Sequence, residues 1–276
     1  MMHNGRSKAF CMSKTRPLTH EPAFVLHQYP WSESSLILEV LTRHHGRLAV
    51  AAKGVKRPTS SFRPVLLPLQ PLALGLSSEG EIRSLKSAEW LGGHVMPVGD
   101  ALLAGFYLNE LLLRLLARDD PHPVLFDHFR QAVLMLAQGG EAAVHPALRA
   151  FELLLLREIG LLPSLETQTL NLQPTDAEQA YELEPEAGLR IATTADEPLA
   201  KPAGISGSKW LAVHDALHTP HAFAELVRLL ASWGGEDRHA LQQQLRGLIH
   251  HHGGAEVMKT RQLMVDLQKL GATPGD

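Results

Sequence analysis

The hydrophobic pattern of the chain changes at Pro97, and this change constrains the fold more than any other feature. Before Pro97, short apolar stretches alternate with polar residues, as in β-strands that bury one face. After it, leucine and alanine recur at helical spacing over longer segments. We therefore predict an α+β protein with a β domain at residues 22–93 and a mainly helical domain at residues 97–270.

The β region holds five short strand candidates within about seventy residues. The second and third, Ser34–Thr42 and Leu48–Ala52, flank a His-His-Gly turn and predict a hairpin. Pro68 and Pro71 interrupt the fourth candidate, so we expect part of it to be an edge or a bulge. Five such strands favour a small barrel, with the oligonucleotide-binding (OB) fold as the leading candidate.

The helical region divides into segments with recognisable boundaries. The first expected helices cover residues 100–117, 124–137 and 146–160. Asp100 is a candidate cap for the first, and Pro146 is placed in the first turn of the third, where proline is common. An acidic, irregular insertion at about 163–208 is expected to form short strands or a mobile segment, and helical periodicity resumes near Lys209.

Charge is unevenly distributed along the chain. Residues 1–95 hold 12 basic and 6 acidic residues, a net charge of +6, whereas residues 96–276 hold 14 and 23, a net charge of −9. This favours a module for polyanions joined to a body with another task, although chance surface composition is the alternative. Residues 1–21 are interpreted as a disordered basic tail.

The composition also predicts several absences. The one cysteine, Cys11, lies in the basic tail, so we expect no cysteine zinc site, no metal and no cofactor. The longest apolar runs are too short to cross a bilayer, so we expect no membrane contact and a cytoplasmic, nucleoid-associated location. No phosphate-binding loop or catalytic signature is present, so we expect no enzymatic activity.

The loop after the third strand candidate is the strongest candidate binding site. The predicted phosphate contacts are Lys53, Lys56, Arg57 and Arg63 in this loop, with Arg43 and Arg47 beside the preceding turn. Cations on a flexible backbone, with hydroxyl groups and no acid among them, suit phosphate binding. The alternative is a solvated loop that only aids solubility.

Aromatic side chains near the same segment are candidates for stacking on bases. Tyr29, Trp31 and Phe62 flank strands or loops, and single-strand binders commonly use such rings. For each of the three, packing into the core is an equally reasonable interpretation.

Several segments together resemble the RecO family of DNA repair proteins. They are Ala23–Leu36, Gly46–Gly54 with the basic loop that follows, Tyr107–Leu112, Ala147–Leu153 and Met258–Arg261. The resemblance implies an OB barrel and a helical domain that bind single-stranded and double-stranded DNA. It implies annealing of complementary strands and loading of RecA, together with RecR, in some cases RecF, and single-stranded-DNA-binding protein. Some relatives carry a cysteine zinc site where this chain has residues 163–208 without cysteine.

The resemblance also suggests a receptor for a partner. The family's partner, single-stranded-DNA-binding protein, has an acidic tail with a hydrophobic end. Arg149 matches an arginine of the family motif, and Leu153 lies one turn further along the expected helix. A guanidinium beside leucines suits a terminal carboxylate with an apolar neighbour. An intrahelical pair with Glu152 is the alternative.

Two other functions remain open at this point. The basic barrel alone fits an RNA- or tRNA-binding protein equally well. A nuclease is the second alternative, but the basic third contains no aspartate and no visible cluster of metal-binding carboxylates.

Overall fold

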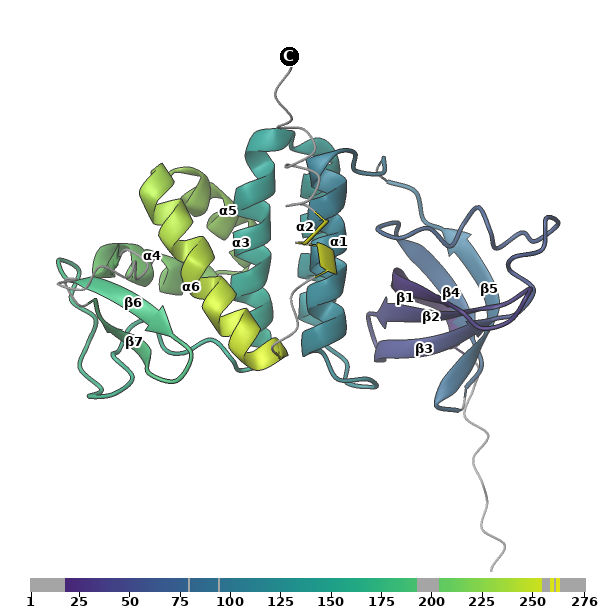
Figure 1. The fold of residues 1–276 in the computed structure, drawn as a ribbon, viewed down its shortest axis with the longest axis horizontal. Coiled ribbons are helices and arrows are strands. Elements are labelled where there is room, and N and C mark those ends of the chain that lie inside the picture. Colours follow the sequence, from purple (N-terminus) through teal and green to yellow (C-terminus); the bar gives the residue numbers. More distant parts are fainter. Residues whose placement is uncertain are drawn as a thin grey trace, which may run out of the picture.

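Five strands close into a barrel, as the alternating pattern predicted. They are β1 (Leu18–Pro30), β2 (Leu36–Thr42), β3 (Gly46–Ala52), β4 (Leu72–Leu76) and β5 (Ile82–Trp90). The computed structural model describes residues 18–78, 80–93, 95–192, 204–254, 259–260 and 262–263. The strand order is β1-β2-β3-β5-β4, with β3 and β5 parallel and the other pairs antiparallel (Figure 1). The mixed five-stranded barrel is OB-like and confirms the predicted N-terminal fold.

Strand alternation sends apolar side chains to two different cores. Val25, Val40 and Val50 point into the barrel and are fully buried. Phe24 and Leu41 point outward and belong to the core of the helical region. The barrel therefore buries an outer wall against the helices as well as its own interior.

Six helices with defined bounds follow the barrel in the part of the chain that the structure describes. They are α1 (Asp100–Leu115), α2 (Pro123–Gln138), α3 (Glu141–Glu158), α4 (Gly207–Leu217), α5 (Ala222–Ala231) and α6 (Gly235–Gly253). Helix α3 is central, because its last three turns are buried on almost every side. Within the described residues no helix is long and apolar enough to cross a membrane.

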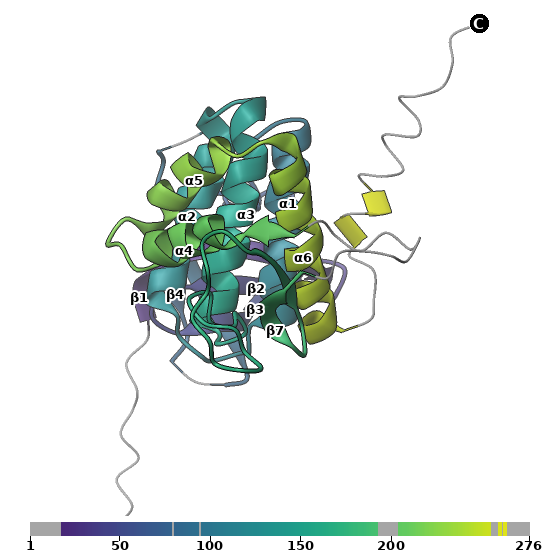
Figure 2. The ribbon, with the colours of Figure 1, turned by 90° about the vertical axis from the view of Figure 1, so that its left-hand side faces the viewer.

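The acidic insertion contains short strands, one of the two alternatives that its sequence left open. Strands β6 (Ala180–Glu184), β7 (Gly188–Ile191) and β8 (Ile205–Ser206) form a sheet in the order β7-β6-β8. Gln244 of α6 accepts a hydrogen bond from the backbone N–H of Leu183 at 2.8 Å, which fixes the sheet to the bundle. In Figure 2 the small sheet and α4 lie in front of the bundle, and the barrel lies behind it.

Several expected boundaries were wrong. Strand β1 begins at Leu18, so residues 18–21 belong to the barrel rather than to the predicted tail, and the rest of that prediction, at residues 1–17, lies outside the described residues. Strand β4 begins only after Pro71, because residues 65–71 belong to the preceding loop. Helix α3 begins at Glu141, so Pro146 lies inside it and removes one backbone hydrogen bond early in the helix.

The β2–β3 turn is fitted against the loop that joins α1 to α2. Gly46 has a φ of +69°, and a Cβ there would overlap the backbone carbonyl of Asp120. The neighbouring Asp119 N–H donates to the carbonyl of Arg47 at 3.0 Å. Further along, Asn109 of α1 donates to the carbonyl of Leu26 at 3.1 Å. These contacts orient the barrel so that its opposite end faces away from the helices (Figure 1).

Candidate nucleic-acid interface

The basic loop lies at the end of the barrel that faces away from the helices (Figure 1). Strand β3 runs from the turn beside the helices to this end, and the loop at residues 53–71 follows it. The β1–β2 turn, residues 31–35, lies at the same end because β1 and β2 are antiparallel. The first part of the loop, residues 53–63, and the turn are therefore neighbours on a surface that the helices leave open, whereas the loop returns toward the helices at Leu69.

Backbone hydrogen bonds hold the turn against the start of the loop. The N–H of Lys56 donates to the carbonyl of Ser34 at 3.0 Å, and the N–H of Gly54 donates to Ser35 Oγ at 3.2 Å. Lys56 Nζ donates to the carbonyl of Ser32 at 2.8 Å. The first part of the loop is thus fixed in place, which positions its cations before any ligand arrives.

Three of the four loop cations have exposed side chains that do not interact with the described residues of the protein. The side chains of Lys53, Arg57 and Arg63 make no hydrogen bond or ion pair with another described residue. Lys56 is half-buried and shares its ammonium group with the Ser32 carbonyl. Such uncompensated cations attract an anionic backbone, and their exposure allows them to follow it.

A further cation near this loop was missed by the sequence analysis. Lys86 of β5 is exposed. The parallel pairing of Ala51 with Ser84 shows that β5 runs toward the same end of the barrel as β3, and Lys86 follows Ser84 by two residues. This direction is set by the β3–β5 pairing, so no local sequence signal could have found Lys86.

The three aromatic candidates separate into two groups. Tyr29 is 46% exposed and Trp31 is 55% exposed, so both rings are available at the open end. Phe62 instead packs against the barrel core and fulfils the alternative given for it. Trp90, which the sequence analysis overlooked, is exposed, and its Nε1 donates to Gln70 Oε1 at 2.9 Å.

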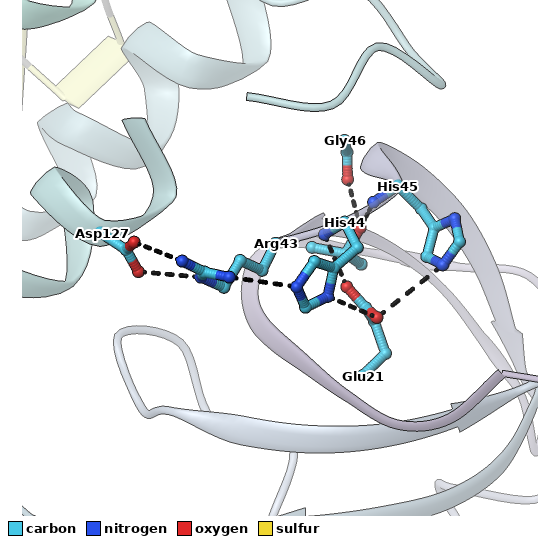
Figure 3. A network of polar contacts seen from close by, with 7 residues as sticks. Glu21, Arg43, His44, His45, Gly46 and Asp127 are labelled. Atoms are coloured by element: carbon cyan, nitrogen blue, oxygen red, sulfur yellow. Dashed lines mark hydrogen bonds and ion pairs between the residues drawn. The ribbon is translucent and has the colours of Figure 1, made fainter. Parts of the chain in front are cut away.

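Arg43 does not lie with the loop cations. It extends from the β2–β3 turn to α2, where Nε and Nη2 donate to the two carboxylate oxygens of Asp127 at 3.1 and 2.7 Å (Figure 3). These hydrogen bonds, with the attraction of the charges, raise the pKa of Arg43 and lower the pKa of Asp127. The prediction that groups Arg43 with the loop is therefore corrected, because an ion pair on the other side of the barrel occupies it.

The same pair continues into a polar network on the barrel. Arg43 Nη1 donates to His44 Nε2 at 3.1 Å, and His44 Nδ1 lies 3.2 Å from Glu21 Oε2 (Figure 3). Glu21 is buried and also accepts the backbone N–H of His44 at 2.8 Å. His45 Nε2 approaches the same carboxylate oxygen at 3.8 Å. Through these contacts Glu21 of β1 holds the β2–β3 turn in place and orients the Arg43 side chain.

Arg47 is likewise separated from the loop. Its Nη1 donates to the carbonyl of Leu113 in α1 at 2.8 Å and lies 3.8 Å from Glu39. Glu39 is buried and also pairs with Arg118. Strand β3 places Arg47 roughly 20 Å from the loop, so it is a junction residue rather than part of one surface with Lys53.

The predicted receptor at Arg149 is not accessible in this structure. Arg149 is 5% exposed, and its Nη2 lies 2.7 Å from Glu152 Oε1 on the same helix. Tyr107 of α1 donates its hydroxyl to the same oxygen at 2.6 Å. Leu153 is fully buried. The intrahelical pair, which was the alternative, is therefore what the bundle forms, since a central helix has no free face for a partner.

No group of three or more histidine, cysteine, aspartate or glutamate side chains in the described parts of the chain is arranged to hold a metal ion. The residues around Glu21 in Figure 3 contact one another through hydrogen bonds and ion pairs.

Comparison with protein families covers nearly the whole chain. Residues 12–94 match the family model for the N terminus of recombination protein O, and residues 96–261 match the model for its C terminus. The chain belongs to the RecO family. The boundary between the two matches coincides with the change from barrel to helices.

Individual RecO proteins are similar over their full length. DNA repair protein RecO of Variovorax paradoxus is 55% identical over 94% of this chain and 100% of that protein. The RecO proteins of Albidiferax ferrireducens and Acidovorax ebreus are 54% and 55% identical, over 93% and 92% of this chain and 98% and 99% of their own. This chain is therefore a RecO-type DNA repair and recombination protein.

Proposed function

We propose that this RecO-family chain is a recombination mediator that binds single-stranded DNA at the open end of its barrel. The observation that supports this most directly is the loop in which the side chains of Lys53, Arg57 and Arg63 are exposed and have no partner among the described residues. Lys56 and Lys86 extend the same basic surface, and Trp31 and Tyr29 offer rings for stacking. Phosphates would supply the affinity, so binding would be largely independent of sequence.

Annealing follows from such a surface. A protein that holds a strand by its phosphates leaves base edges free to pair with a complementary strand. Double-stranded DNA would bind to the same cations, because they recognise the backbone. We infer no chemical step for the protein, which would act at the nucleoid by positioning strands.

The protein partners of the proposal come from the family. RecR, single-stranded-DNA-binding protein through its acidic tail, and RecF in some relatives would cooperate with this chain to load RecA. The enclosed Arg149 gives no support to the tail site first expected there, so the location of that contact is not assigned.

The test is strand annealing with and without a coat of single-stranded-DNA-binding protein. The parent should accelerate annealing of bare strands and of coated strands. A variant with Lys53, Arg57 and Arg63 replaced by alanine should lose both activities, whereas Arg228→Ala, on the far side of the bundle in α5, should keep both. Unchanged annealing by the triple variant would refute this assignment of the DNA surface.

Binding of RNA or tRNA is the second candidate, favoured only by the basic barrel itself. Competition between single-stranded DNA and RNA of matched length distinguishes the two. The RecO proposal expects DNA to compete at least as well as RNA, and a clear preference for RNA would support the alternative.

A further inference from the structure

A cavity of about 530 Å³ lies between β1, α1 and the segment that contributes Lys259, Thr260 and Leu263. Its apolar wall comes from all three segments and consists of Leu26, Phe106, Leu113 and Leu263. His27 and Tyr29 line it from β1. A mostly apolar cavity of this size with a few polar groups is typical of a site for a small ligand or a ring.

Asn109 is a polar group in the wall whose hydrogen bonding is incomplete. Its side chain is 2% exposed, and Nδ2 donates to the carbonyl of Leu26 at 3.1 Å. Its Oδ1 is buried and has no hydrogen-bond partner among the described residues. Because buried acceptors are almost always satisfied in native proteins, this oxygen is a candidate acceptor for a donor on a ligand.

Glu110, the next residue of α1, already has hydrogen-bond partners for both carboxylate oxygens. Its carboxylate accepts the backbone N–H groups of Lys259 and Thr260 at 2.8 and 2.9 Å and the Thr260 hydroxyl at 2.6 Å. Arg114 donates to it at 2.9 Å and balances its charge. Burial raises the pKa of Glu110, but these hydrogen bonds outweigh it and leave the pKa below its ordinary value. Glu110 is therefore not free to bind a cation, and Asn109 Oδ1 with the apolar wall suits a flat group that carries a hydrogen-bond donor.

A row of rings connects this cavity with the basic loop. His27 and Tyr29 share the outer face of β1, because residues two apart on a strand point the same way. Their rings are 4.4 Å apart between centroids. Trp31 follows two residues later in the turn that meets the loop. The three rings therefore follow one another along the chain from the turn at the basic loop to the cavity, and DNA held by the loop could reach the cavity along them.

We propose that the cavity receives one base of the single strand that the basic loop holds. The base would enter past Tyr29, pack against the apolar wall and donate an exocyclic amino hydrogen to Asn109 Oδ1. Cytosine and adenine carry such an amino group and thymine does not. The proposal rests on the proposed function, since it needs a strand bound at the open end of the barrel.

The proposal is tested by substitutions that fill the cavity with a larger side chain, each measured with strands that differ in their bases. The full chain and the variants Leu263→Trp and Leu113→Trp are titrated by fluorescence anisotropy with oligo(dC), oligo(dT) and a wholly abasic strand of equal length. Leu263 is 48% exposed, so its replacement leaves the core intact, and melting curves check both variants. Leu170→Trp is the matched control, because Leu170 is 74% exposed in the insertion.

Both filling variants should bind oligo(dC) about tenfold more weakly than the parent, roughly the value of one base contact, and bind the abasic strand as the parent does. The loss should be smaller with oligo(dT), and Leu170→Trp should match the parent throughout. Unchanged binding of oligo(dC) by both variants, or an equal loss with the abasic strand, would overturn the cavity proposal alone. Equal losses with oligo(dC) and oligo(dT) would overturn the role of Asn109. Failure of the parent to bind any strand would overturn the proposed function and the cavity proposal together.

Discussion

Arg43 and Asp127 form a two-pronged ion pair that joins the β2–β3 turn to α2, with N–O distances of 3.1 and 2.7 Å. Both side chains are partly exposed, so the pair stabilises the junction only modestly. Its main effect is on Arg43 itself, which is directed toward the helices and away from the open end of the barrel.

We expect Arg43→Ala to lower the melting temperature slightly and to leave single-strand affinity at moderate salt nearly unchanged. Asp127→Asn should have a similar effect on the melting temperature. The double variant should lose little more than either single variant, because both remove the same interaction. If Arg43→Ala reduced DNA affinity as much as Arg57→Ala does, Arg43 would belong to the DNA-binding surface after all.

The basic loop should determine the salt dependence of DNA binding. Replacing Lys53, Lys56, Arg57 and Arg63 together with alanine should reduce the slope of log K against log salt by up to roughly 3, about 0.7 for each phosphate contact. The effect should be the same on unrelated sequences. Glu33→Gln, in the turn that meets the loop, should strengthen binding slightly because it removes a negative charge. An unchanged slope in the fourfold variant would leave the loop as a merely solvated surface.

Gly46→Ala should destabilise the protein by about 2 kcal/mol or more. The backbone has a φ of +69°, and the added Cβ would overlap the carbonyl of Asp120. Gly54→Ala is the control, since its φ is +70° but its nearest neighbour would be the Arg57 side chain at 3.8 Å. Urea unfolding should show the smaller loss for Gly54→Ala, and equal losses would show that strain alone, rather than contact with the α1–α2 loop, is responsible.

Arg149→Ala should cost about 3–5 kcal/mol in unfolding free energy, because it leaves the buried Glu152 carboxyl group with the Tyr107 hydroxyl but without its cation. Arg149→Met combined with Glu152→Gln should recover part of this loss. Urea unfolding of the three proteins tests the expectation. A fully stable Arg149→Ala variant would show that the pair contributes little and would reopen a direct role in binding a partner.

Stability should fall as the pH drops from about 6.5 toward 4. Burial, assisted by the nearby charges of Arg149 and Arg238, lowers the pKa of His145 to about 4. The unfolded chain, with the histidine near its ordinary pKa of 6.5, therefore binds a proton in this range that the folded protein resists. His145→Gln should flatten this part of the pH profile in urea unfolding. An equally steep profile in the variant would assign the dependence to other groups.

The sequence by itself determined the division of the chain and the type of each part. Alternating apolar residues predicted the barrel strands, the His-His-Gly turn predicted the β2–β3 hairpin, and helical spacing predicted α1, α2 and α3 to within a few residues. These features depend on periodicity and turn chemistry, which neighbouring residues carry. The exposure of Lys53, Arg57 and Arg63 was also readable, because cations that lie in a loop between strands, among Gly, Pro and Ser, are usually solvated.

Only the tertiary structure decided which candidate side chains face solvent and which face another element. Arg43 pairs with Asp127, 84 positions away, and the carboxylate of Glu110 meets Thr260, 150 positions away. Arg149 looked like a cation on an apolar helix, but the helix is central, so burial forced it to pair with Glu152. Periodicity encodes which face of a strand or helix is apolar, whereas the partner opposite that face is set by how the elements pack.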